Sequence, residues 1–78
     1  MISNDDIKNA TNKLIDLVKE LERKYPNHPL LSSVKQFLKR LLEHCRLINK
    51  GIKDYDQNEC LMNEILSWIN KIRQALSN

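Results

Sequence analysis

The sequence predicts an all-α protein, a small antiparallel three-helix bundle that dimerisation could complete. The chain has 78 residues, 41% of them hydrophobic and 29% charged, which is typical of folded proteins and too apolar for a disordered chain. One glycine and two prolines provide few turn signals, which disfavours a sheet of short strands. Apolar residues recur at helical spacing in three segments separated by short corners. Because a chain this short can bury only one core, we expect residues 1–78 to form a single domain.

The first helix is predicted over residues 4–25. Its apolar face consists of Ile7, Ala10, Thr11, Leu14, Leu17, Val18, Leu21 and Tyr25. Ser3 and Asp6 have the spacing of a capping box, in which each side chain bonds to the backbone amide of the other residue. Pro26 disfavours helical geometry in the residue before it, so the helix should end at Tyr25.

The second helix is predicted over residues 29–50. Its broad apolar face consists of Leu30, Leu31, Val34, Phe37, Leu38, Leu41, Leu42, Cys45 and Ile48. Pro29 suits the first turn of a helix, where its missing N–H costs nothing. Gly51 can adopt the left-handed conformation that often follows the last helical residue, so the helix should end at Lys50.

The third helix is predicted over residues 57–77, and its apolar arc is the widest of the three. The arc consists of Leu61, Met62, Ile65, Leu66, Trp68, Ile69, Ile72 and Leu76. Asp56 and Glu59 have the spacing of a second capping box. Three amphipathic helices of about 20 residues, joined by short corners, should pack as antiparallel neighbours about 30 Å long.

The corner around residues 43–60 holds both cysteines and one of the two histidines, which raises the question of a metal or redox site. Two of its side chains, Leu47 and Cys60, fall off the core faces of their helices. Helix-cap chemistry accounts for both of them. Leu47 is placed to contact Ile52 in a Schellman motif, and Cys60 is placed to contact Tyr55 in a hydrophobic staple. We therefore interpret this segment as a helix corner.

We expect no metal site and no cofactor. A structural zinc ion needs four ligands at about 2.0–2.3 Å. His28 and His44, however, stand about 24 Å apart along one helix. A Cys45–Cys60 disulfide is an alternative, because antiparallel helices could bring these levels together, but the two side chains point in different directions. We favour free, buried thiols that act as small hydrophobes.

Enzymatic activity is not expected either. The sequence contains no Gly-rich phosphate loop, no Gly-x-Ser-x-Gly elbow and no Glu-x-x-His pattern. His44 and Cys45 are adjacent, so on a helix their side chains diverge by about 100° and cannot pair as base and nucleophile. Carboxylate pairs such as Asp54 with Asp56 lie in helix caps or on solvated faces, where little would raise a pKa.

Positive charge is concentrated in residues 26–53, which carry six basic side chains and one acidic side chain. Four of these cations form an outward stripe within about 60° of helical arc. We call Lys35, Lys39, Arg46 and Lys50 the basic stripe. This stripe could bind an acidic protein or the phosphates of a nucleic acid, or it could be a solvated face that complements the helix dipole. Four cations would neutralise few phosphates, so nucleic-acid binding would be weak and strongly salt-dependent.

Apolar residues also lie on both sides of the core-facing stripe of each predicted helix. One flank carries Ile15, Leu42 and Leu66, and the opposite flank carries Leu17, Phe37 and Trp68. A three-helix core could absorb both flanks, because each helix contacts two neighbours. Alternatively, part of this arc stays exposed as an apolar patch for a partner helix or for a second copy of the bundle. Trp68 is then the first candidate anchor, because aromatic residues dominate interface energetics.

We therefore predict a non-enzymatic, cytoplasmic module that binds another protein through an apolar or basic helix face, in the manner of a small regulator, inhibitor, immunity factor or adaptor. A homodimer is a related alternative, and a weak nucleic-acid-binding protein is the second hypothesis. The start of the chain does not resemble a signal peptide, and no uncharged stretch reaches the roughly 20 residues of a membrane span. Abundant Asn, Lys and Ile, whose codons are A/T-rich, suggest an AT-rich microbial or phage genome. The predicted roles suggest a phage or plasmid origin.

Overall fold

The computed structural model describes residues 2–51 and 57–77 and confirms the predicted bundle of three helices. The helices are α1 (Asn4–Lys24), α2 (Leu30–Asn49) and α3 (Asn58–Ser77). Their bounds differ from the predicted ranges by no more than one residue at any end. None of the helices in these described ranges is long and apolar enough to cross a membrane.

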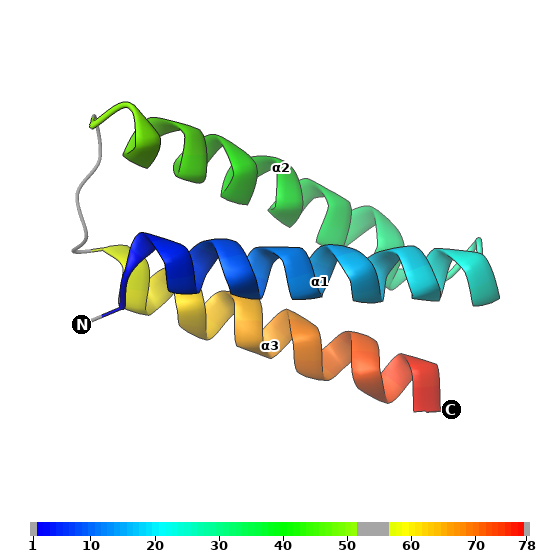
Figure 1. Cartoon of the computed structure of the whole chain (residues 1–78). Coiled ribbons are helices and arrows are strands. Elements are labelled where there is room, and N and C mark those ends of the chain that lie inside the picture. The colour runs from blue at the N-terminus through cyan, green and yellow to red at the C-terminus, as the bar shows by residue number, and fades with distance from the viewer. Residues whose placement is uncertain (1, 52–56, 78) are drawn as a thin grey trace.

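α1 is the central helix, antiparallel to α2 and parallel to α3, and it packs against both of them (Figure 1). α2 and α3 pack against each other much more weakly. Figure 1 shows that α2 is inclined to α1, so that the two helices converge near the first corner and diverge toward the C-terminal end of α2. The seam between α2 and α3 is therefore the least tightly packed of the three.

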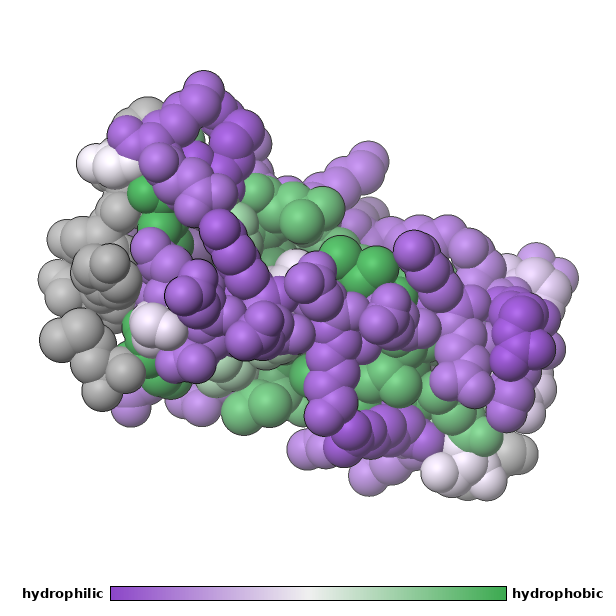
Figure 2. All heavy atoms as spheres, in the orientation of Figure 1, coloured by the Kyte–Doolittle hydropathy of each residue, from purple (hydrophilic) through white to green (hydrophobic). Residues whose placement is uncertain are grey.

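The core lies where the apolar stripes of the three helices face one another. Its buried residues are Ile7, Leu14, Val18, Leu21, Leu31, Val34, Phe37, Leu41, Ile65, Ile69 and Ile72. Within each helix most of these residues recur at intervals of three or four, which is the periodicity that predicted the helices. Figure 2 shows hydrophobic atoms on either side of the hydrophilic outer face of α1, along its seams with the two other helices.

The predicted capping box at the start of α1 is confirmed. The Asp6 amide donates to the Ser3 hydroxyl oxygen at 3.1 Å, and the Ser3 amide donates to the Asp6 carboxylate, also at 3.1 Å. Both bonds satisfy backbone donors that the helix itself leaves unpaired. Asp5 and Asp6 add negative charge in the first turn, where the helix dipole favours it.

Local contacts in the first corner determine where α1 ends and where α2 begins. Tyr25, predicted to be helical, has φ −136° and ψ 75°, because the following proline excludes helical geometry. Pro29 lies at the N-cap of α2, with φ −63° and ψ −24°. The His28 ring caps this helix, since its Nδ1 accepts a hydrogen bond from the Leu30 amide at 3.1 Å. His28 therefore has a structural role that the sequence did not reveal.

The second corner confirms the expected conformation of Gly51. This residue has φ 75°, a left-handed value that costs an L-residue with a Cβ roughly 1–2 kcal/mol. Its amide donates to the carbonyl of Ile48 at 2.9 Å, which satisfies one of the last carbonyls of α2. Three partners in the predicted capping motifs lie outside the described residues: Ile52, Tyr55 and Asp56.

Candidate functional site

A groove follows the loosely packed seam between α2 and α3. Its larger part has a volume of about 520 Å³ and is lined by Phe37, Lys39, Arg40, Leu41, Glu43, His44, Leu61 and Glu64. A smaller hollow of about 190 Å³ shares three of these residues and adds Gln57 and Cys60 at the start of α3. Because the two hollows share part of their lining, we treat them as one surface and call it the α2–α3 groove.

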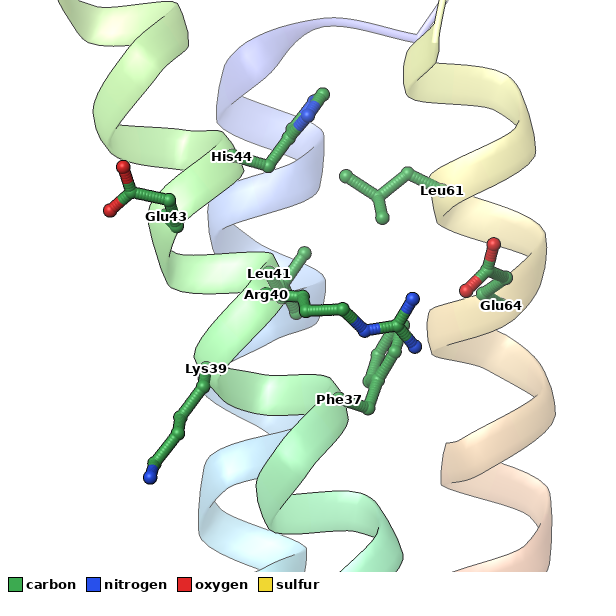
Figure 3. A pocket seen from close by; sticks show the side chains of 8 residues that line it. All are labelled: Phe37, Lys39, Arg40, Leu41, Glu43, His44, Leu61 and Glu64. Atoms are coloured by element: carbon green, nitrogen blue, oxygen red, sulfur yellow. The ribbon is translucent and has the colours of Figure 1, made fainter.

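The floor of the α2–α3 groove is apolar and its rim is charged. Phe37 and Leu41 of α2 are 3% and 1% exposed, and Leu61 of α3 is partly buried. Figure 3 shows Leu61 directed from α3 toward α2, the Arg40 side chain reaching across the space between them, and α1 behind. An apolar centre with a polar rim is the usual anatomy of a protein-binding surface.

Two aromatic rings and two cations lie at one end of the groove, where Phe37 and Arg40 belong to its lining and Trp68 and Lys71 lie next to it. The ring centroids of Phe37 and Trp68 lie 6.2 Å apart, with an interplanar angle of 30°. The Arg40 Cζ atom lies 5.7 Å from the centroid of the Phe37 ring. The Lys71 Nζ atom lies 4.7 Å from the centroid of the Trp68 ring. Attraction between a cation and an aromatic ring at such distances holds each cation beside its ring.

The other end of the groove is closed by a buried polar contact. The Asn58 amide nitrogen donates to the Ile2 carbonyl at 3.2 Å and to Asn4 Oδ1 at 2.9 Å. Asn58 Oδ1 is an acceptor and lies 3.5 Å from His44 Nε2, which donates to it in the tautomer that carries the hydrogen on Nε2. The His44 side chain turns inward to Asn58 and is 7% exposed, so it belongs to the buried part of α2.

The six residues predicted as an apolar patch are not equally accessible. Phe37 is buried in the core, which corrects its assignment to a surface, because the helix turns it toward Trp68. Three others are partly buried: Ile15, Leu17 and Trp68. The remaining two, Leu42 and Leu66, are 51% and 48% exposed. The structure therefore places Trp68 against Phe37, which lines the groove, whereas Leu42 and Leu66 are exposed away from the lining.

The basic stripe is exposed on α2, but part of its charge is compensated within the chain. Two of its cations form ion pairs, Lys35 with Glu22 of α1 and Arg46 with Glu43 of α2. The other two, Lys39 and Lys50, have no ion pair with the rest of the described chain. The stripe therefore offers less free charge than its composition indicates, and nucleic-acid binding stays a prediction.

Both cysteines are free thiols in separate environments. Cys45 is partly buried between α1 and α2, whereas Cys60 is exposed and lines the α2–α3 groove. The prediction of a buried thiol is therefore wrong for Cys60, which faces the open seam instead of the core. Burial raises the pKa of the Cys45 thiol, and this effect outweighs the opposing effects of a hydrogen bond with Thr11 and of the positive charge on Lys8.

Thiol-specific alkylation of the folded protein should modify Cys60 much faster than Cys45. If Cys45 reacts only after a local opening that costs about 1.4 kcal/mol, its modification is about tenfold slower. Because burial raises its pKa, the Cys45 rate should continue to rise above the pH at which an ordinary thiol ionises. Mass spectrometry of timed samples measures both rates. Equal rates would contradict the assigned burial, and two unreactive thiols that require prior reduction would indicate a disulfide.

The two histidines are too far apart to bind one metal ion together. His28 caps α2 and His44 contacts Asn58 at the far end of the same helix. In residues 2–51 and 57–77, no three His, Cys, Asp or Glu side chains are grouped so that they could hold a metal ion. The chemistry that the α2–α3 groove offers is therefore that of its apolar floor, its exposed thiol and its charged rim.

Sequence reasoning missed Asn58, Arg40 and Lys71, although each had a signal. Asn58 lies seven residues before Ile65, so it occupies the core stripe of α3, and a pattern that counts only apolar residues passes over it. Arg40 and Lys71 each follow an aromatic residue by three positions. Residues three apart on a helix are neighbours, so this repeated spacing predicts a cation beside a ring.

The α2–α3 groove is therefore identified as a candidate site from the structure of this chain alone. Comparison of the chain with protein-family models, with curated proteins and with solved structures returned no match.

Proposed function

We propose that this protein is a non-enzymatic binding module that holds a segment of another protein in the α2–α3 groove. The observation that supports this proposal is that the weak packing of α2 against α3 leaves Leu61 partly exposed in a groove that also has the buried side chains of Phe37 and Leu41 in its lining. Apolar surface of this kind is unfavourable in water, and a bound segment would remove it from solvent. Small regulators, inhibitors, immunity factors and adaptors are proteins that act in this way.

A helix is the segment that suits this groove. The lining residues of α2 run from 37 to 44, which corresponds to about 10 Å at 1.5 Å per residue. An amphipathic helix with apolar anchors at i, i+3 or i+4, and i+7 covers the same length. Its binding would place a fourth helix against α2 and α3, as in a four-helix bundle. Arg40 in the lining and Trp68 next to Phe37 are of the residue types that most often dominate binding energy.

Cys60 provides a direct test, because its thiol is exposed within the groove. A photo-crosslinker attached to Cys60 should form an adduct with a specific protein in an extract of the native host, identified by mass spectrometry. The matched control carries the crosslinker at Asn12→Cys in a Cys60→Ser background, since Asn12 is exposed on α1. This control should not form the same adduct.

Two leucine variants show whether the adduct depends on the groove. Leu61→Glu places a charge on the apolar floor and should abolish the Cys60 adduct. Leu66→Glu makes the same change at an exposed position outside the lining and should leave the adduct in place. Circular dichroism establishes that both variants are folded. The proposal fails if both crosslinker positions capture the same proteins, or if folded Leu61→Glu forms the adduct as wild type does.

A further inference from the structure

We infer that the α2–α3 groove selects an amphipathic helix with an acidic flank, and that a carboxylate of this helix pairs with Arg40 or Lys71. The inference rests on the proposed function and adds the chemistry of the partner. The observation behind it is the juxtaposition of two cations and two aromatic rings at one end of an apolar groove.

The groove carries more uncompensated positive charge than negative charge. Lys39 and Arg40 of its lining, and Lys71 beside it, have no carboxylate oxygen within 4.0 Å in residues 2–51 and 57–77. Of the two acidic residues in the lining, Glu43 forms an ion pair with Arg46. Glu64 is then the acidic residue that opposes these cations. The local field therefore favours a partner with negative charge.

The two cations are also partly ordered before a partner binds. Arg40 lies against the ring of Phe37 and Lys71 lies against the ring of Trp68. Long cationic side chains usually lose conformational entropy when they pair with a carboxylate, and this loss opposes binding. Contact with a ring reduces the number of conformations that remain to be lost, so both cations are favourable partners for an acidic side chain.

An acidic helix fits this end of the groove better than a nucleic acid does. Base stacking requires an open aromatic face. Phe37, however, is only 3% exposed, and Lys71 covers a face of Trp68. The neighbouring floor of Leu41 and Leu61 suits aliphatic side chains spaced along a helix.

Three designed helical peptides test the charge preference. They share one apolar face, lack tryptophan, and carry either Glu, Gln or Lys on both flanks. Binding is followed through the fluorescence of Trp68, which is the only tryptophan of the chain, at low and at high salt. The Glu peptide should bind about tenfold more tightly than the Lys peptide, because several exposed charge pairs change sign together. This difference should shrink at high salt.

Single charge removals in the protein should shift the affinity for the Glu peptide in opposite directions. Arg40→Gln and Lys71→Gln should each weaken binding by about threefold, which is the effect of one exposed ion pair. Glu64→Gln should strengthen binding, because it removes the opposing charge from the same groove. Lys19→Gln is the matched control, since Lys19 is exposed on α1 and does not line the groove.

The outcomes separate this inference from the proposed function. Equal affinities for the three peptides would overturn the acidic preference, while binding itself would still support a helix-binding groove. If none of the three peptides binds but the Cys60 adduct still depends on Leu61, the inference of an acidic partner helix is overturned. The proposal of a protein-binding module would then still stand. The inference is also overturned if an oligonucleotide displaces the Glu peptide at physiological salt, or if light scattering shows that a second copy of the chain occupies the groove.

Discussion

Ile65→Ala is expected to destabilise the folded protein by about 2–5 kcal/mol, whereas Leu66→Ala is expected to cost less than about 1 kcal/mol. The two residues are adjacent in α3, but Ile65 is 0% exposed and Leu66 is 48% exposed. Truncation of Ile65 leaves a cavity that the surrounding side chains cannot fill completely. Truncation of Leu66 removes a side chain that water already contacts, so little burial is lost.

Urea denaturation followed by far-UV circular dichroism measures both free energies of unfolding. The pair is well matched, because alanine raises helix propensity at both positions. Ile65→Val should cost about 0.5–1.5 kcal/mol, which establishes that the effect follows the deleted volume. If Leu66→Ala costs as much as Ile65→Ala, Leu66 must be covered in solution, and a dependence of unfolding on protein concentration would identify a second copy as the cover.

The helices could be predicted because their determinants are local. The capping box of Ser3 and Asp6 and the left-handed Gly51 act within a few residues of their own position. The apolar period likewise needs only the residues of one helix. The end of a helix is therefore determined by a short stretch of sequence. The observed bounds accordingly agree with the predicted ranges to within one residue.

The groove could not be predicted, because it depends on how far α2 and α3 stand apart. A helical wheel places Phe37 and Trp68 on one flank, but it does not say whether the neighbouring helix covers that flank completely. The answer depends on the inclination of α2 relative to the other two helices, which the packing of many side chains sets together. Phe37 consequently belongs to the core, while Leu61 on the facing helix is only partly covered.

The buried contact of His44 with Asn58 could not be predicted for a related reason. Each residue lies on the core stripe of its helix, where a polar side chain is unfavourable unless a partner is available. The partners of Asn58 are Ile2 and Asn4, more than 50 positions away in the sequence. A pattern within one helix contains no information about such partners.

Asn58→Ala is expected to destabilise the protein by about 2–4 kcal/mol, because it removes two donated hydrogen bonds and leaves His44 without its acceptor. Asn58 is 0% exposed, so water cannot readily replace these bonds. Asn63→Ala is the matched control, since it makes the same substitution at an exposed position of the same helix and should change stability by no more than about 0.5 kcal/mol.

A double-mutant cycle with Asn4→Ala distinguishes the loss of this contact from a general loss of packing. Asn4 Oδ1 accepts from Asn58 at 2.9 Å, and residues in direct contact usually show coupling free energies of about 0.5–3 kcal/mol. Additive effects of Asn4→Ala and Asn58→Ala would contradict the assigned hydrogen bond. A measurable coupling would establish that the start of α3 is tied to the start of α1, and this tie holds the His44 end of the α2–α3 groove in place for a partner helix.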